Sequence, residues 1–179
     1  VIFLKVNMHK FSFSAGVACV AALLSFNVQA QDTTRRMGDL LAVGLPAFAA
    51  GLTFVNDDKE GFMQLAKSEG ATFLIVEALK ASHHEMRPDG SDNKSFPSGH
   101  AAVAFSAAQF LQMKGGWEYG VPAYLAASYV GYSRVESHKH YWKDVVAGAA
   151  TGALTTYYFT DATHGRRLGM SWTGRSASL

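Results

Sequence analysis

The chain has 179 residues, of which 49% are hydrophobic and only 17% are charged, compared with about 25% charged in an ordinary soluble domain. The formal net charge of +2 shows no basic excess, which argues against a nucleic-acid partner, and the single cysteine excludes an intrachain disulfide. The length suits one domain with a full core and leaves no room for a second.

The first thirty residues have the pattern of an export signal. Lys5 and Lys10 form a basic lead-in, and residues 15–26 are mostly apolar and carry no charge. Val28-Gln29-Ala30 places small residues at the two positions that a signal peptidase inspects. We expect cleavage after Ala30 and export to the periplasm or to the periplasmic side of the cytoplasmic membrane. An uncleaved membrane anchor is the alternative.

The remaining chain, residues 31–179, is expected to form a single all-α domain with its core at about 39–159 and a loosely held, basic tail at 163–179. Apolar residues recur at helical spacing, and no segment alternates with a period of two. The expected helices cover residues 39–55, 61–80, 98–113, 119–132 and 140–159. We therefore predict a bundle of about five to six helices with the active site at one end.

The hydropathy of these helices is compatible with a soluble bundle and with a membrane bundle. The uncharged stretches are shorter than the ~20 apolar residues that a membrane span needs, but longer than those of a typical core helix. Frequent Gly and Ala suit tight helix packing in either setting. The uncharged stretches and the frequent Gly and Ala together slightly favour association with a membrane.

The first of three polar clusters follows the second predicted helix. Lys80 and Arg87 lie seven residues apart where this helix ends. Arg87-Pro88-Asp89-Gly90 is a turn sequence, because proline fixes φ at the second position and glycine tolerates a positive φ. The surrounding loop, residues 83–95, is polar and is expected at a water-accessible end of the bundle. Cations in so apolar a chain are costly to bury unless they meet an anion.

The second cluster, Ser98-Gly99-His100, begins a predicted helix. The free backbone N–H groups and the partial positive charge of a helix N-terminus favour an anion, which Gly99 lets approach closely and Ser98 can hydrogen-bond. The third cluster begins with Arg134, whose planar guanidinium bonds two phosphate oxygens at once. These residues together describe a cradle for a phosphoryl group.

The third cluster also holds His140 and Asp144, four residues apart. On a helix they would share a face, so that the carboxylate accepts one ring N–H and leaves the other ring nitrogen free to attack. His100, brought from another helix, would be a second imidazole that donates a proton. An anion cradle, an oriented nucleophile and an acid indicate phosphoryl transfer through a phosphohistidine.

The three clusters match the signature motifs of one family. Lys80-x6-Arg87-Pro88, Pro97-Ser98-Gly99-His100 and Ser133-Arg134-x5-His140-x3-Asp144 resemble those of the type 2 phosphatidic acid phosphatase and haloperoxidase superfamily. The resemblance implies that His140 is the nucleophile, Asp144 its orienting partner and His100 the general acid. It also implies that Lys80, Arg87, Ser98, Gly99 and Arg134 hold the phosphoryl oxygens, with no metal and no cofactor.

The resemblance implies a phosphatase for phosphomonoesters or diphosphates, with a lipid-borne substrate favoured. A soluble non-specific acid phosphatase of the same superfamily is the main alternative. A vanadate-dependent haloperoxidase and a non-catalytic phospholipid-binding membrane protein are the others. Six residues outside the motifs are given ordinary roles: His83, His84 and His138 in loops or at the rim of the pocket, and Lys59, Lys67 and Lys114 on the solvated surface.

Overall fold

The computed structural model describes the backbone of residues 13–162 and the side chains of residues 32–162. The basic lead-in with Lys5 and Lys10 and the expected tail at 163–179 lie outside the described residues. The described chain contains five helices: α1 (Phe13–Val55), α2 (Lys59–Ser82), α3 (Gly99–Gly115), α4 (Trp117–Glu136) and α5 (Trp142–Phe159). No strand occurs in this part of the chain, which confirms the all-α prediction.

The helices begin where side chains satisfy their first backbone N–H groups. Asp58 Oδ1 accepts a hydrogen bond from Gly61 N at 2.8 Å and caps α2, while Ser98 Oγ accepts from Ala101 N at 3.4 Å and caps α3. The observed helices differ from the predicted ranges by a few residues, except for α1, which contains Pro46 and extends back through Ala30 to Phe13. α5 begins at Trp142, so that His140 precedes the helix.

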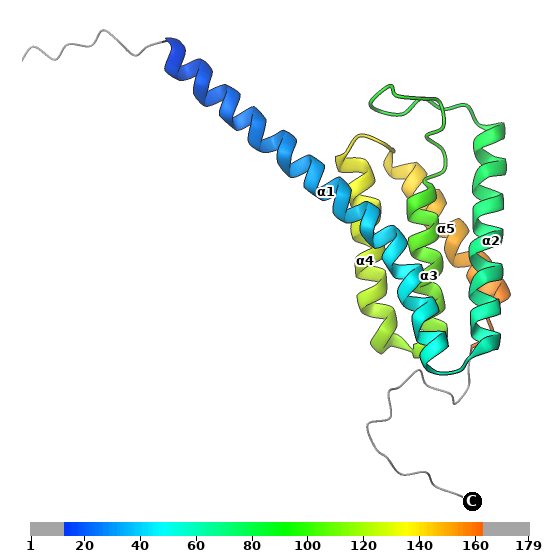
Figure 1. Cartoon of the computed structure of the whole chain (residues 1–179). Helices are drawn as coiled ribbons and strands as arrows, with labels where there is room; N and C mark the ends of the chain where they lie inside the picture. The colour runs from blue at the N-terminus through cyan, green and yellow to red at the C-terminus, as the bar shows by residue number, and fades with distance from the viewer. Residues whose placement is uncertain (1–12, 163–179) are drawn as a thin grey trace, which may run out of the picture.

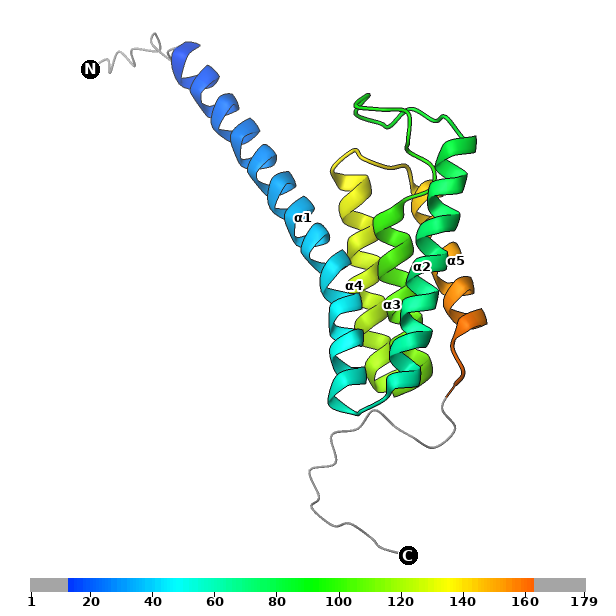
Figure 2. The same ribbon diagram turned by 45° about the vertical axis from the view of Figure 1, so that its right-hand side comes forward.

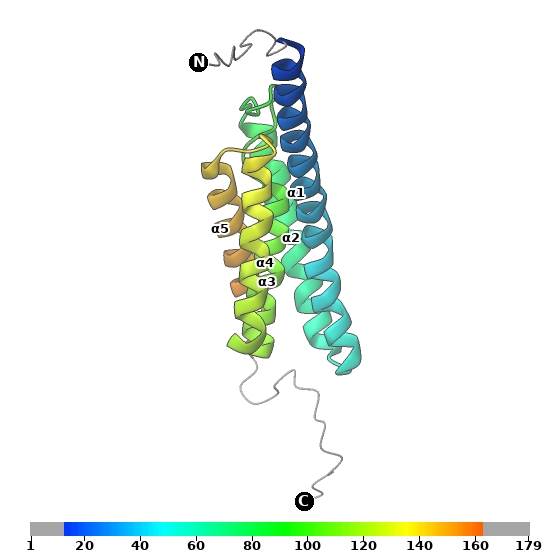
Figure 3. The same ribbon diagram turned by 90° about the vertical axis from the view of Figure 1, so that its left-hand side faces the viewer.

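α3 is the central helix of the bundle. It packs against the four other helices, with α1, α2, α4 and α5 around it (Figure 1). The N-terminal part of α1 extends beyond the bundle (Figure 2). The α2–α3 loop and the α4–α5 loop lie at the same end (Figure 3). This end is where the three polar clusters meet.

The interior of the bundle is built from small side chains. Gly152 of α5 lies so close to α3 that a Cβ there would be 2.9 Å from Ser106 N and would collide with the Ala102 carbonyl oxygen. Hydroxyl groups link the helices: Ser106 and Thr156 are 2.8 Å apart, and Thr72 and Thr155 are 2.5 Å apart. Small residues and interhelical hydroxyl pairs are typical of helices that pack inside membranes.

Although Phe110 and Leu111 are buried in the core, many large apolar side chains lie on the exterior. Leu40, Phe73, Leu125 and Tyr158 are examples from α1, α2, α4 and α5, with 67%, 59%, 67% and 81% of their surface exposed. In the described part of the chain, one helical segment, Asp32–Val55, is long and apolar enough to cross a membrane, with a mean hydropathy of 1.6.

Lys114 corrects one expectation about the surface. It is buried near the C-terminus of α3, where its Nζ lies 3.7 Å from Asp58 Oδ2. A buried lysine of this kind is tolerated because it meets a carboxylate.

Candidate active site

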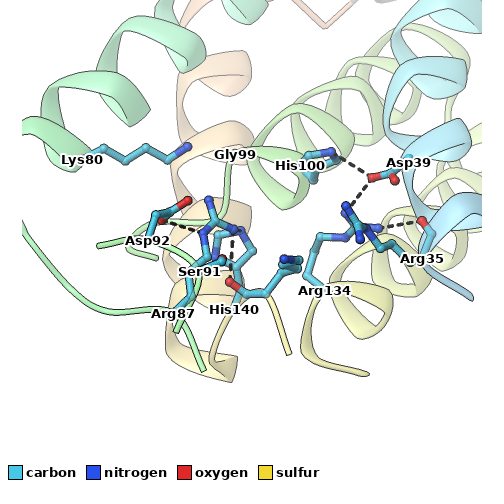
Figure 4. A pocket seen from close by; sticks show the side chains of 11 residues that line it. Arg35, Asp39, Lys80, Arg87, Ser91, Asp92, Gly99, His100, Arg134 and His140 are labelled. Carbon is cyan, nitrogen blue, oxygen red and sulfur yellow. Dashed lines mark hydrogen bonds and ion pairs between the residues drawn. The ribbon is translucent and has the colours of Figure 1, made fainter. Parts of the chain in front are cut away.

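A cavity of about 310 Å³ opens at the end of the bundle where the two long loops lie (Figure 4). Its cationic side chains outnumber its carboxylates, which makes it suited to an anion. The cations are Arg35, Lys80, Arg87, Arg134 and Lys139, the carboxylates are Asp39 and Asp92, and Ser91, Gly99, His100 and His140 complete the lining. All three clusters therefore contribute to one site.

Arg87 is held in the cavity by its loop. The predicted turn is present, since Gly90 N donates to the Arg87 carbonyl oxygen at 2.9 Å and Gly90 has a φ of 70°. The guanidinium donates from Nε to Asp92 Oδ1 at 2.8 Å and from Nη1 to the Lys139 carbonyl oxygen at 3.2 Å. Arg87 is thus fixed before any ligand binds.

His140 is buried, and its two ring nitrogens face partners of opposite kind. Nδ1 lies 2.7 Å from the Ser95 carbonyl oxygen, which can only accept a hydrogen bond. Nε2 lies 3.3 Å from Arg87 Nη1, which can only donate. The arrangement selects the tautomer with its proton on Nδ1 and its lone pair on Nε2, where the lone pair accepts from Arg87 Nη1. The atom that carries this lone pair belongs to a residue that lines the cavity.

Burial and the charge of Arg87 lower the pKa of His140 from 6.5 to about 4, although the Ser95 carbonyl and Asp144 act in the opposite direction. Removing an imidazole from water disfavours its charged form, and a nearby guanidinium adds to that effect. His140 is therefore neutral at pH 7, as a nucleophile must be.

Ser95 lies between Asp144 and His140, with its hydroxyl donating to the carboxylate and its carbonyl oxygen facing the ring. The direct hydrogen bond expected from their spacing is absent, because Nδ1 and Asp144 Oδ2 are 3.7 Å apart and His140 lies outside α5. Oδ2 instead accepts from Ser95 Oγ at 2.5 Å and from Tyr141 N at 2.9 Å. Sequence reasoning missed Ser95, because a serine in a polar loop has no distinguishing pattern.

His100 and the start of α3 form the opposite wall of the cavity. Ser98 is fully buried and its N–H donates to the Asp144 carbonyl oxygen at 2.9 Å, so it lies behind the cavity lining. Gly99 and His100 line the cavity itself. Burial and the charges of Arg134, Lys80 and Arg87 lower the pKa of His100, and Asp39 opposes them.

Arg134 is anchored by α1, which sequence reasoning did not connect to the site. Its Nη1 donates to Asp39 Oδ1 at 2.6 Å and its Nη2 donates to the Arg35 carbonyl oxygen at 2.8 Å. Asp39 Oδ1 is also 3.1 Å from His100 Nε2 (Figure 4). Arg35 and Asp39 belong to no motif, and only the packing of α1 against α4 brings them here.

The remaining histidines stand apart from the reaction centre. His83, His84 and His138 are exposed, and His138 has a positive φ of 54° in the α4–α5 loop. Among residues 32–162, no three His, Cys, Asp or Glu side chains are grouped so that they could hold a metal ion.

Comparison with known proteins gives this architecture its family. Residues 75–168 match the model of the PAP2 superfamily, and the chain belongs to that superfamily. The chain is 42% identical over 84 residues to a lipid A 1-phosphatase of Porphyromonas gingivalis, an alignment that spans 45% of this chain and 19% of the relative. It is 29% identical over 135 residues to a lipid A 4'-phosphatase of Helicobacter pylori, spanning 69% and 68% of the two chains.

Two crystal structures share the fold. The structure of Aquifex aeolicus LpxE has a TM-score of 0.55 with 24% identity, covering 72% of this chain and 92% of that one. A transmembrane PAP2 type phosphatidylglycerolphosphate phosphatase from Bacillus subtilis has a TM-score of 0.58 with 24% identity, covering 85% and 86%.

Proposed function

We propose that the protein is a metal-independent phosphatase that hydrolyses lipid-borne phosphate esters through a phosphohistidine at Nε2 of His140. The observation that carries this proposal is the fixed tautomer of His140, whose Nδ1–H is held by the Ser95 carbonyl oxygen while Nε2 is directed at Arg87. A cavity that only bound phosphate would have no need of a neutral, oriented imidazole.

The reaction follows from the placement of these groups. Nε2 of His140 attacks phosphorus, the bond from phosphorus to the ester oxygen breaks, and the leaving alkoxide takes a proton from His100. A water molecule then attacks the phosphohistidine, the P–N bond breaks, and His100 takes up a proton of that water. Lys80, Arg87 and Arg134 offset the charge of the phosphoryl oxygens, as electrostatic stabilisation requires.

A second cavity, next to the first, supports the proposal that the substrate carries an apolar group on its phosphate. It has a volume of about 270 Å³, lies between α1, α2 and α3, and shares Lys80, Gly99 and His100 with the first cavity. The remainder of its wall is mostly apolar, with Val43, Phe73, Val76 and Val103 among its residues. This adjacency favours a phosphorylated lipid over a sugar or nucleotide phosphate, and it distinguishes the proposal from a soluble acid phosphatase.

The outer surface of the bundle supports a location in the membrane, with the cavity facing the water outside the bilayer. The exposed apolar side chains of α1, α2, α4 and α5 suit contact with lipid, whereas the loop at 83–95 is exposed and polar. Export by the signal at residues 1–30 would place this end of the bundle on the periplasmic side.

The test is a search for the covalent intermediate. The active protein, mixed with phosphorus-32-labelled lipid phosphate and quenched within milliseconds, is expected to yield an acid-labile, base-stable phosphoprotein. His140→Asn should form none and should lose at least about 10³-fold in kcat, because the nucleophile is absent. Lys67→Gln, on the exposed face of α2, is the control and should match the wild type. Substantial turnover by His140→Asn would overturn the mechanism.

A further inference from the structure

Asp39 joins two residues of the site that come from different helices. Its Oδ1 accepts from Arg134 Nη1 at 2.6 Å and lies 3.1 Å from His100 Nε2. α1 approaches α4 closely here, since a Cβ at Gly38 would lie 2.7 Å from Arg134 Nη2. Asp39 lies outside residues 75–168, the part of the chain that the PAP2 model matches, and belongs to none of the three motifs.

The charges around His100 make this carboxylate important. Three cations, Arg134, Lys80 and Arg87, disfavour the imidazolium form of His100. In the described structure, Asp92 is the other carboxylate of the cavity, and it is bound to Arg87 Nε at 2.8 Å. The charged groups that act on His100 are Asp39 from α1, Lys80 from α2, Arg87 from the α2–α3 loop and Arg134 from α4, while Arg35, Lys139 and His140 line the same cavity.

We infer that Asp39 is a positioning residue for the acid step, which orients the His100 ring and stabilises its protonated form against the surrounding cations. The inference rests on the proposed phosphatase function. Without Asp39, His100 would lose its proton at a lower pH, and the bond from phosphorus to a poorly leaving alkoxide would break without a donor. The amide oxygen of Asp39→Asn can still accept from Arg134 Nη1, so this variant removes the negative charge beside His100 and keeps an anchor for Arg134.

The experiment compares two substrates whose leaving groups differ in their need for a proton. Asp39→Asn is expected to lower kcat for an alkyl phosphate ester about tenfold or more at pH 7, because general acid catalysis supplies about 10²–10⁴-fold in rate. The decline of kcat at high pH should also move towards lower pH, because His100 loses its proton more easily without the carboxylate. Hydrolysis of p-nitrophenyl phosphate, whose leaving group departs without protonation, should stay within about threefold. Asp32→Asn, which removes the same charge from an exposed position of the same helix, is the control.

A double variant and a titration separate this inference from the proposed function. Asp39→Asn added to His100→Ala should cause no further loss in kcat for the alkyl ester, because the two residues act as one unit. Nitrogen-15 NMR of the histidines, with His100 assigned by its absence from His100→Ala, should report a lower pKa for His100 in Asp39→Asn whether or not the protein turns over. An equal loss on both substrates, a rise in activity, or an unchanged His100 titration would overturn the inference. If the wild-type protein hydrolyses no phosphate ester but the His100 pKa still falls in Asp39→Asn, only the phosphatase proposal is overturned.

Discussion

At the scale of single residues, Ser95 has the most unexpected position. It is fully buried, and it offers its hydroxyl to Asp144 and its carbonyl oxygen to His140. Asp144 Oδ1 has no hydrogen-bond partner and is inaccessible to solvent. Ser95 therefore links the carboxylate to the imidazole by two contacts, one from its side chain and one from its backbone.

Ser95→Ala is expected to lower kcat about tenfold or more, because it leaves both oxygens of a buried carboxylate without a side-chain donor, at a cost of about 1–3 kcal/mol. The carbonyl contact to His140 survives, so activity should not vanish as it does in His140→Asn. Steady-state kinetics on the purified variants measures the effect. Ser128→Ala, at an exposed serine of α4, should behave as the wild type. Equal activity of the two alanine variants would contradict the role of Ser95.

The depressed pKa of His140 has a consequence for the pH profile. Because this pKa is lowered to about 4, the nucleophile stays neutral far below pH 6.5 and is lost only as the pH falls through about 4. Arg87→Gln removes a charge that lowers this pKa, so the acidic limb of kcat/KM should move to higher pH. Arg87→Lys keeps a positive charge and should leave the limb in place. Ionisation of the substrate affects Arg87→Gln and Arg87→Lys equally. An acidic limb at the same pH in both variants would therefore contradict the effect of the Arg87 charge on His140.

At the scale of elements, the sequence predicted the helices better than the contacts between them. Apolar spacing located α2, α3 and α4 to within a few residues, because that spacing is a local property. Pro46 did not interrupt α1, since packing of a long helix can compensate for one lost hydrogen bond. The motifs predicted that Lys80, Arg87, His100 and Arg134 meet in one site, and all four line the cavity. The positions of Asp39 and Ser95 depend on tertiary packing, which no local sequence pattern encodes.

The close contact of α5 with α3 should make its glycine irreplaceable. Gly152→Ala places a methyl group against the Ala102 carbonyl oxygen, and we expect a loss of about 1–3 kcal/mol in the free energy of unfolding. Gly70→Ala, in α2, meets nothing within 4 Å and should be neutral or stabilising by up to about 1 kcal/mol. Denaturation in a mild detergent compares the two. A Gly152→Ala protein as stable as Gly70→Ala would show that α5 can shift away from α3.

The cavity between α1, α2 and α3 can be filled from Val43, a residue that does not line the polar cavity. Val43 is 72% exposed and lines this cavity, so Val43→Trp should fold and occupy the space. We expect KM for a long-chain lipid phosphate to rise about tenfold, while a short soluble ester is hydrolysed within about twofold of the wild-type rate. Val146→Trp, at an exposed position of α5, is the matched control. A similar response of both substrates would contradict a lipid site.

At the scale of the whole molecule, processing and membrane attachment are compatible. Cleavage after Ala30 would leave the candidate span Asp32–Val55 intact, together with Asp39 in the active site. We expect the protein to fractionate with membranes, to need detergent for extraction, and to begin at Gln31. Fractionation and N-terminal sequencing check these expectations. Residues before Ala30 still attached would favour an uncleaved anchor, and release by salt alone would contradict membrane residence.

The hydroxyl pairs inside the bundle also set the axial register of the helices. Thr72 and Ser106 bond to the adjacent residues Thr155 and Thr156 of α5. These two bonds align α2 and α3 against one short stretch of α5, so none of the three helices can slide by a turn without breaking a pair. Lys80 lies in the last turn of α2, His100 lies in the first turn of α3, and His140 precedes α5. Contacts in the middle of the bundle, away from the cavity, thus set the spacing between Lys80, His100 and His140.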